Sequence, residues 1–281
     1  MKRADIAILP AEQLSRSALA GLWNLAYEGY FVPVAFDEQR FARHLRRANV
    51  DLGVSKVLMA GGKPAGLSLV GRREARAYLA GFGIVRAQRR RGLARLLIEV
   101  QLAALPAAGV RELVLEVIEQ NPARTLYGQA GFEAMRPLEL LEGTLDTRTI
   151  AAVALDVADL AAVHPRCSAV ARPTWRRELP TVLDALTHEN AAAIGVRRGG
   201  TVVAYAVLPE PARHDGTLLD AAAVDEAAAH TLLDMLSSAR PGTRWRLVDE
   251  PGDSPFFHAA HARGLVPVMR QIEMKRYFQC Q

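Results

Sequence analysis

The order of the hydrophobic segments is repeated along the chain, and this repeat limits the folds available to it. Each half carries two short apolar runs around a glycine pair, Gly61-Gly62 and Gly199-Gly200, which is typical of a β-hairpin. Each half later reaches a glycine followed by an apolar residue, Gly131-Phe132 and Gly264-Leu265, after a short helical pattern. We therefore predict an internal duplication, with two unrelated mixed α/β domains as the alternative.

Hydrophobic spacing predicts the individual elements of the first half in the order α, α, β, β, β, α, β, α, β. The first helix is expected over residues 11–30, and Asp37 is expected to start the second. The other predicted elements are strands at 55–60, 65–70, 77–85 and 113–118, a helix at 92–105, a short helix at 121–131 and a strand from 132.

The second half shows the same order with weaker signals. Its predicted elements are a helix at 175–186, strands at 191–196, 202–208 and 218–224, a helix at 226–238, a strand at 245–248, a short helix at 255–262 and a strand from 265. The predicted fold class is α/β with a mixed, α+β type of sheet. We predict two domains in tandem, 1–144 and 150–281, each with a central, mostly antiparallel sheet flanked by helices.

Size and composition agree with two globular domains. The chain has 281 residues, half of them hydrophobic and 23% charged. Its two cysteines exclude a disulfide scaffold and a four-cysteine zinc site, and His258 and His261 lack a third ligand, so no metal is predicted. The first residues resemble no signal peptide, and no apolar stretch is long enough to span a membrane. We expect a cytoplasmic protein without a membrane partner.

The positive charge is concentrated in one short segment. The formal net charge is +5, and the whole excess lies in residues 1–146. Five arginines fall within ten residues: Arg86, Arg89, Arg90, Arg91 and Arg95. A nucleic-acid-binding protein usually spreads such charge over a face, whereas a compact cluster beside a glycine favours a small anionic ligand. We therefore predict no nucleic-acid partner; a solvated arginine-rich helix start is the alternative.

The segment from Arg89 to Ala94 lies between a predicted strand and a predicted helix. Backbone N–H groups at a helix start lack intrahelical partners and lie at the positive end of the helix dipole, so a diphosphate can accept their hydrogen bonds. Gly92 allows a ligand to approach the backbone closely. The segment lacks the Gly-Lys-Ser/Thr of a Walker loop and does not match G-x-G-x-x-G.

These motifs resemble those of the GNAT superfamily of N-acetyltransferases. Arg89-Arg90-Arg91-Gly92-Leu93-Ala94 matches the family's Arg/Gln-x-x-Gly-x-Gly/Ala signature, and the stretch from Asn121 through Tyr127 to Gly131-Phe132 matches its second signature. The resemblance covers roughly residues 5–140 and implies acetyl-coenzyme A as the acyl donor. The implied cofactor-binding residues are Ile84, Val85, Arg86, Arg89, Arg90, Arg91, Gly92, Leu93, Ala94, Arg95, Asn121 and Tyr127.

The resemblance also implies a mechanism, in which an amine attacks the thioester directly. Tyr127 corresponds to the family's general acid, although it could instead only pack its short helix. A backbone N–H near Ile84 or Val85 would meet the thioester carbonyl oxygen. Asn121 would bind the pantetheine arm or cap the short helix, and the residues leave both open.

The general base and the acceptor are less well defined. Strand 77–85 holds no carboxylate, so we consider Glu28 and Glu116 as weak candidates for the base, with a solvated or structural role as the alternative for each. Tyr27, Tyr30 and Phe31 would line the acceptor site, unless they belong to the core. The acceptor is expected to be a small-molecule or peptide amine.

The second half resembles a degenerate acetyltransferase-like domain. Its equivalent loop carries Asp225 and Glu226, whose charges would repel a diphosphate. We predict an acetyl-coenzyme A-dependent N-acetyltransferase with one functional site, and we keep a homodimer open. The alternative is a non-catalytic module that binds coenzyme A or an acyl thioester.

Overall fold

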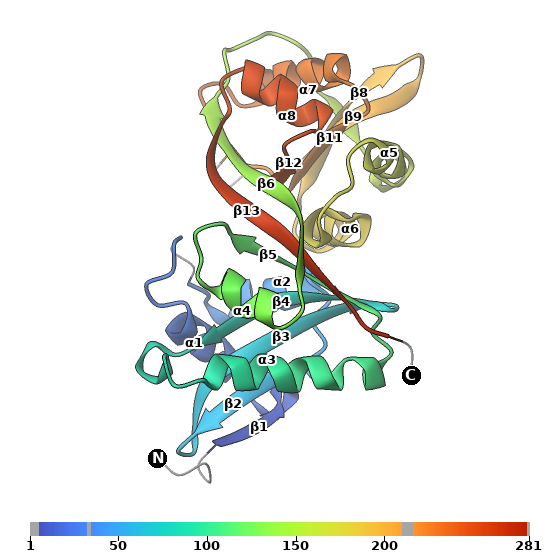
Figure 1. Cartoon of the computed structure of the whole chain (residues 1–281). Helices are drawn as coiled ribbons and strands as arrows, with labels where there is room; N and C mark the ends of the chain where they lie inside the picture. The colour runs from blue at the N-terminus through green and yellow to red at the C-terminus, as the bar shows by residue number, and fades with distance from the viewer. Residues whose placement is uncertain (1–5, 33–34, 210–215, 280–281) are drawn as a thin grey trace. The chain divides into compact units, whose positions relative to one another are not determined.

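The structure is a computed structural model that describes residues 6–32, 35–209 and 216–279. The chain forms two compact units, and Figure 1 labels their elements. Unit 1 comprises Met1–Glu116, Asn121–Ala134 and Met274–Gln281; unit 2 comprises Val117–Gln120 and Met135–Glu273. Two units were predicted, but their boundaries differ from 1–144 and 150–281. Unit 1 includes the end of the chain, and unit 2 includes residues 135–144.

Unit 1 contains a mixed sheet with helices on both faces. Its elements are β1 (Ile6–Pro10), α1 (Arg16–Ala26), α2 (Glu38–Arg47), β2 (Lys56–Ala60), β3 (Lys63–Arg73), β4 (Arg76–Ile84), α3 (Leu93–Ala104), β5 (Glu112–Ile118, of which Val117 and Ile118 fall in unit 2) and α4 (Ala123–Gln129). The strand order is β1-β2-β3-β4-β5, followed by the end of β13 (Val266–Tyr277). Side chains cap the starts of α1 and α2. Ser15 accepts a hydrogen bond from Ala18 N–H, and Asp37 accepts one from Arg40 N–H.

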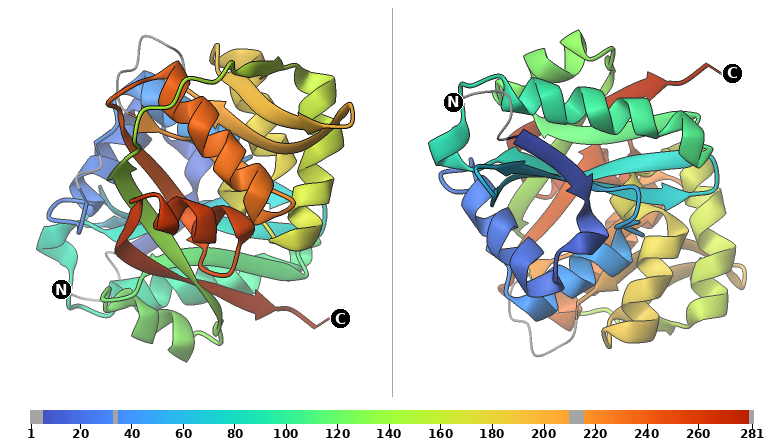
Figure 2. Two further views of the ribbon diagram at one scale, coloured as in Figure 1. Left: turned by 90° about the horizontal axis from the view of Figure 1, so that it is seen from above. Right: turned by 90° about the horizontal axis from the view of Figure 1, so that it is seen from below.

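Glycines let α1 approach β4 closely. A Cβ at Gly81 would lie 2.0 Å from the ring of Trp23, and one at Gly83 would lie 3.1 Å from the Cβ of Ala26. The alternate residues of β4, Phe82 and Ile84, pack instead with α3. The sheet therefore separates α1 from α3, as the right-hand view of Figure 2 shows in blue and green.

Two irregularities of β4 shape the region that follows. Leu69 pairs with Gly81 and Val70 with Leu79, so Ala80 forms a β-bulge. β4 also pairs in parallel with β5, but only from Arg76 to Tyr78. Beyond these residues β4 and β5 are not paired, and the edges of the two strands are open toward each other.

Unit 2 repeats this arrangement. Its elements are β6 (Glu133–Thr144, from Met135 onward), β7 (Val153–Leu155), α5 (Val157–Val170), α6 (Leu179–His188), β8 (Ala192–Arg198), β9 (Thr201–Leu208), β10 (Gly216–Thr217), β11 (Asp220–Ala223), α7 (Glu226–Ala239), β12 (Arg244–Pro251), α8 (Pro255–Ala262) and β13 up to Glu273. Short 3₁₀ turns at Ala11–Gln13, Arg86–Gln88, Pro106–Ala108 and Trp175–Arg177 complete the chain. One sheet has the order β13-β6-β12-β10, the other β11-β9-β8-β7.

A pair of parallel strands that separate after a short paired stretch, as β4 and β5 do, also occurs in unit 2. β10 pairs in parallel with β12 for two residues, and the chain then continues into β11, which pairs with β9 instead. This matches the way β4 first pairs with β5 and then departs from it. The long strands β6 and β13 have twelve residues each and the same pattern of burial, with exposed positions first and four consecutive buried positions after them. Both observations agree with the predicted duplication.

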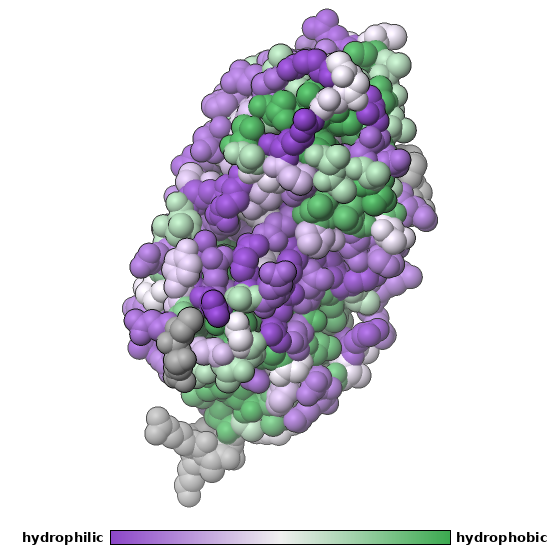
Figure 3. All heavy atoms as spheres, turned by 90° about the vertical axis from the view of Figure 1, so that its right-hand side faces the viewer, coloured by the Kyte–Doolittle hydropathy of each residue, from purple (hydrophilic) through white to green (hydrophobic). Residues whose placement is uncertain are grey.

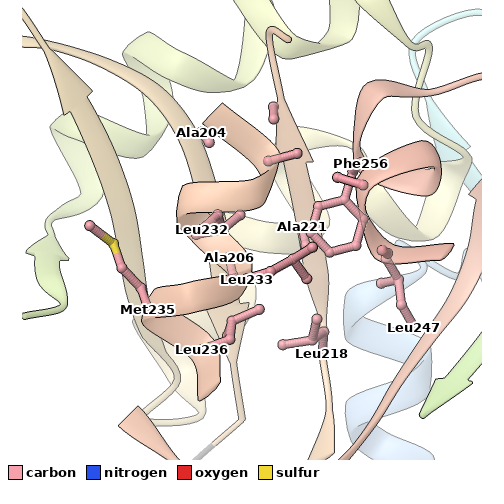
Figure 4. Packing of buried hydrophobic residues seen from close by; sticks show 14 of the residues in the cluster. Ala204, Ala206, Leu218, Ala221, Leu232, Leu233, Met235, Leu236, Leu247 and Phe256 are labelled. Carbon is pink, nitrogen blue, oxygen red and sulfur yellow. The ribbon is translucent and has the colours of Figure 1, made fainter. Parts of the chain in front are cut away.

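The core of unit 2 is built largely from small and branched side chains. Leu232, Leu233 and Leu236 of α7 pack on Ala204 and Ala206 of β9, and Figure 4 shows these contacts together with Phe256 of α8. Every one of these side chains is almost fully buried. Alanines on the strand allow α7 to lie close to the sheet, which the weak hydrophobic periodicity of this half did not indicate.

Several elements differ from the prediction. β1, β7 and α5 were missed, and the helix expected over 11–30 is a 3₁₀ turn followed by the shorter α1. α5 contains Pro165, which sequence reasoning treats as a helix breaker, yet tertiary packing of Leu160 and Val163 retains the helix. The helix expected from Trp175 begins as a 3₁₀ turn, and α6 starts only at Leu179.

Among the described residues, no helix is long and apolar enough to cross a membrane. The face in Figure 3 is mostly hydrophilic, with hydrophobic residues in separate patches.

Candidate active site

The loop between β4 and α3 forms an open helix start. Gly92 is the N-cap residue of α3 with φ +77°, and Leu96 N–H is bonded to Gly92 O at 3.1 Å. The N–H groups of the first turn therefore lack intrahelical acceptors, and within the described chain no side chain caps this helix. A Cβ at Gly92 would meet nothing within 4 Å, so there is open space beside the loop. This arrangement fits an anionic ligand.

The arginines around the loop do not all have the same surroundings. Arg86 and Arg90 are exposed. Arg91 donates to the side chain of Gln88 within the loop, and Arg95 donates to the side chain of Gln129 at the end of α4. Arg90 has φ +60°, an unusual backbone conformation for a residue with a side chain, so the loop turns tightly here.

Arg89 lies in the predicted phosphate motif, but its donors are engaged elsewhere. Its N–H is bonded to Arg86 O at 3.2 Å. Its guanidinium donates to Ile84 O at 2.9 Å and to Ala26 O at 2.7 Å, with a longer contact to Glu28 O at 3.4 Å. Local turn formation and the carbonyls at the end of α1 therefore engage the donors of Arg89 in this structure.

The unpaired edge of β4 carries two N–H groups. Val85 N–H is bonded to Ala65 O at 2.9 Å, on the β3 side of β4. Because successive N–H groups of a strand point to opposite edges, those of Ile84 and Phe82 face the β5 side. Phe82 N–H indeed donates away from β3, to the hydroxyl of Tyr27 at 3.3 Å. Of the two predicted oxyanion contacts, Ile84 N–H therefore faces the unpaired edge, whereas Val85 N–H is bonded to β3.

Tyr127 lies on α4 and is buried, with 7% of its surface exposed. Its ring packs against Phe82 and Phe132, with centroids 6.0 and 5.7 Å away. Burial raises the pKa of Tyr127 well above its usual range, and the neighbouring Tyr27 and Tyr30 raise it further. The hydroxyl therefore stays protonated near neutral pH and is able to donate a proton or a hydrogen bond.

Asn121 connects two parts of this region. Its Oδ1 accepts from Ala123 N–H at 2.9 Å, so it caps the start of α4. Its Nδ2 lies 3.5 Å from the hydroxyl of Tyr30. The bond to Ala123 N–H agrees with the capping role, and the contact with the pantetheine arm stays a prediction.

The predicted acceptor residues follow α1. Tyr27 stacks on Trp23 with centroids 4.3 Å apart, and Tyr30 meets Tyr27 edge-on at 5.0 Å. Both tyrosines are half-buried, whereas Phe31 is 50% exposed. Sequence reasoning missed His44 of α2, whose Nε2 lies 3.1 Å from the carbonyl oxygen of the bulge residue Ala80. The helical spacing of Phe41 and Leu45 placed this helix but not its contact with the bulge.

The two candidates for the general base lie in different environments. Glu28 is exposed beyond the end of α1. Glu116 is half-buried on β5, and its Oε2 accepts a hydrogen bond from the hydroxyl of Tyr78 at 2.6 Å. Tyr78 pairs with Gly71, where an added Cβ would meet the end of α2. Tyr78 and Glu116 therefore lie on the face of the sheet that α1 and α2 cover.

A groove of about 660 Å³ lies beside the loop, between α3 and α4. Arg95, Ile98 and Leu102 of α3 form one wall, and Leu126 and Gln129 of α4 belong to the other. Its volume is in the usual range of small-molecule sites.

The equivalent helix start in unit 2 is closed by its own side chains. Asp225 caps α7 by accepting from Ala228 N–H at 2.8 Å, and it pairs with Arg198 at 2.7 and 3.1 Å. The hydrogen bond from Arg198 lowers the pKa of Asp225 to about 2, so the carboxylate stays charged. A bound anion would have to displace this carboxylate.

The splayed strands of unit 2 are also closed. The guanidinium of Arg177 donates to Ala221 O of β11 at 2.6 Å and to Asp249 O of β12 at 3.0 Å. Asp220 and Glu250 pair with the same guanidinium, so its charge is balanced inside the unit. Arg177 thus bridges β11 and β12 of unit 2, at the place that corresponds to the unpaired stretch between β4 and β5 in unit 1.

We therefore expect one coenzyme A to bind per chain. Calorimetric titration of the whole chain with coenzyme A measures the stoichiometry, and the expected value is close to one. Asp225→Gly in a chain that keeps Arg198 should leave this value unchanged, because Arg177 still closes the strands. A value near two for the wild-type chain would show that unit 2 is functional.

Comparisons with known proteins identify the class. The family model described as Acetyltransferase (GNAT) domain matches residues 26–147. No curated protein matches the chain by sequence. The chain therefore contains a GNAT acetyltransferase domain, as the motifs indicated, and this family typically uses acetyl-coenzyme A. Within the described residues no group of three or more His, Cys, Asp or Glu side chains could hold a metal ion.

Solved structures extend the likeness to the full length. A tandem GNAT protein from the clavulanic acid biosynthesis pathway matches with a TM-score of 0.70 and 14% identity, covering 97% of this chain and 98% of that one. A candidate acetyltransferase from Pyrococcus horikoshii matches with a TM-score of 0.70 and 12% identity, covering 100% of this chain and 92% of that one. A GCN5-related N-acetyltransferase from Sphaerobacter thermophilus matches with a TM-score of 0.65 and 16% identity, covering 97% of this chain and 95% of that one. The fold of the chain is that of tandem GNAT proteins.

Proposed function

We propose that unit 1 transfers an acetyl group from acetyl-coenzyme A to an amine. The observation that carries this proposal is the open helix start at Gly92 beside an unpaired strand edge, with a buried, protonated Tyr127 in the same unit. The first-turn N–H groups of α3 would bind the diphosphate, and the exposed Arg86 and Arg90 would attract it. The groove between α3 and α4 leaves room for the nucleotide end.

Acetyl-coenzyme A supplies the activated acetyl group when it is bound. The N–H of Ile84 would donate to the thioester carbonyl oxygen as negative charge develops there. The nitrogen lone pair of the amine forms the new C–N bond, and the C–S bond breaks with its electrons on sulfur. The hydroxyl of Tyr127 would donate a proton to that sulfur.

The proton lost by the amine needs an acceptor. We propose Glu116, because it lies half-buried on the sheet face covered by α1 and α2, and Tyr78 holds one of its oxygens. Glu28 is exposed and less well placed. Tyr27, Tyr30 and Phe31 would contact the acceptor, which favours an amine attached to an apolar group.

Gly92→Glu is expected to weaken coenzyme A binding at least about tenfold, roughly 1.4 kcal/mol. The side chain adds a negative charge where the diphosphate would lie. Gly109→Glu is the matched control, because Gly109 has φ +79° against +77° for Gly92 and equally open surroundings. Both variants carry the same backbone strain, so calorimetry with coenzyme A isolates the charge effect. Equal affinities of the two variants would contradict the loop assignment.

The proposed activity is tested by release of free thiol from acetyl-coenzyme A on a panel of amines. Amines with apolar substituents are expected to be the better acceptors. Binding of acetyl-coenzyme A without turnover on any amine, peptide or lysine acceptor would instead support the non-catalytic module.

A further inference from the structure

Arg89 joins two segments that are far apart in the sequence. Its guanidinium binds Ala26 O of α1 at 2.7 Å and Ile84 O of β4 at 2.9 Å, and it also approaches Glu28 O. Ile84 ends the strand whose free edge faces β5, and Gly92 follows Arg89 by three residues. One side chain therefore connects the candidate diphosphate loop with the end of α1.

The end of α1 attracts a cation for a simple reason. The last carbonyl groups of a helix have no intrahelical donors and carry the negative end of the helix dipole. A planar guanidinium can serve several carbonyls at once in a fixed geometry, whereas a lysine is a single flexible point charge. The interaction at Arg89 is therefore specific for arginine.

The segment held by Arg89 carries the proposed acceptor residues. Tyr27 is the C-cap residue of α1, with its N–H bonded to Trp23 O at 2.9 Å, and Tyr30 N–H is bonded to Tyr27 O at 3.0 Å. The hydroxyl of Tyr27 also accepts from Phe82 N–H on the free edge of β4. The position of this turn therefore depends on both the loop and the strand.

We propose that Arg89 is a positioning residue that couples the two sites: filling the diphosphate loop fixes Arg89 and thereby orders the acceptor-lining turn at residues 27–31. The coupling rests on the proposed function, since it needs coenzyme A in the loop. It is reciprocal, so order at the turn also strengthens binding at the loop, and such couplings typically amount to about 5- to 150-fold.

Hydrogen exchange of the whole chain, measured in the presence and absence of coenzyme A, tests the proposed coupling. It needs no known acceptor. In the wild type, coenzyme A should slow hydrogen exchange in the loop. It should also slow exchange at the amides of Tyr27 and Tyr30, by at least about fivefold. Arg89→Gln and Arg89→Lys should keep the loop protection at saturating coenzyme A and lose the protection at Tyr27 and Tyr30.

Arg91→Gln is the matched control. It removes one charge from the same cluster and a side chain that donates to Gln88 of the loop, so coenzyme A should bind more weakly while the turn is still protected at saturation. Wild-type protection of the turn in Arg89→Gln would overturn the coupling and leave the proposed function intact. Absence of loop protection in the wild type would overturn the proposed function, and the coupling with it.

Discussion

Tyr127→Phe is expected to bind coenzyme A as the wild type does and to turn over acetyl-coenzyme A roughly 100-fold more slowly or worse. Phenylalanine keeps the ring and its packing against Phe82 and Phe132, so the fold is retained. What is lost is the hydroxyl that would donate to the leaving sulfur. Steady-state kinetics on an active amine, with calorimetry for binding, measures both quantities.

The control for this variant is a second buried hydroxyl in the same chain. Tyr205 is buried in unit 2, where its hydroxyl donates to Asp220 at 2.6 Å. Tyr205→Phe should lower stability without changing the chemical step, because its partner lies outside the proposed site. Unchanged turnover of Tyr127→Phe on a good acceptor would remove Tyr127 from the mechanism.

The pH dependence provides an independent readout for Tyr127. A general acid works only in its protonated form, so activity would be lost as the pH rises through the pKa of Tyr127. Burial raises this pKa above the ordinary value near 10, which moves the loss to still higher pH. Turnover should therefore not decline below about pH 10 because of Tyr127. An alkaline decline near pH 8 or 9 that disappears in Tyr127→Phe would contradict the raised pKa of Tyr127.

Local sequence patterns predicted the parts of the site that depend on neighbouring residues. The helix start at Gly92 follows from an arginine-rich turn, a glycine and an apolar helix, all contiguous in the chain. The burial of Tyr127 follows from its place before Gly131-Phe132. The hydrogen bonds of Arg89 could not be predicted this way, because its partners Ala26 and Glu28 lie at the end of α1 and in the turn after it, more than sixty residues earlier.

The structure agrees with the predicted duplication, whereas its two units differ from the predicted boundaries at 1–144 and 150–281. The sequence predicts strands that begin at residues 132 and 265, but it does not show which sheet each one joins. The contacts place most of β6 in unit 2 and the end of β13 in unit 1. Reciprocal ion pairs in unit 2, Arg136 with Glu273 and Arg270 with Glu139, occur at related positions of the two strands.

Deleting residues 274–281 is expected to unfold unit 1 and to abolish coenzyme A binding, although the helix start at Gly92, the unpaired edge of β4 and Tyr127 all lie before residue 132. The deletion also removes Arg276 and Phe278, which line the groove between α3 and α4. In unit 1, Phe278 N–H is bonded to Arg111 O at 2.9 Å, and Lys275 pairs with Glu112 at 3.2 Å. Met274 is 5% exposed. Loss of one buried methionine and several strand hydrogen bonds costs about 4 kcal/mol or more, a large part of the stability of a typical domain.

A chain that lacks only residues 280 and 281 is the control, because these lie outside the described residues and the named contacts all remain. Thermal unfolding and calorimetry with coenzyme A compare the two truncations with the full chain. A synthetic peptide of residues 274–281, added in excess, should partly restore binding to the longer truncation, since it supplies the missing strand. If the boundary lay at residue 144, the longer truncation would instead bind coenzyme A normally, and only unit 2 would lose stability.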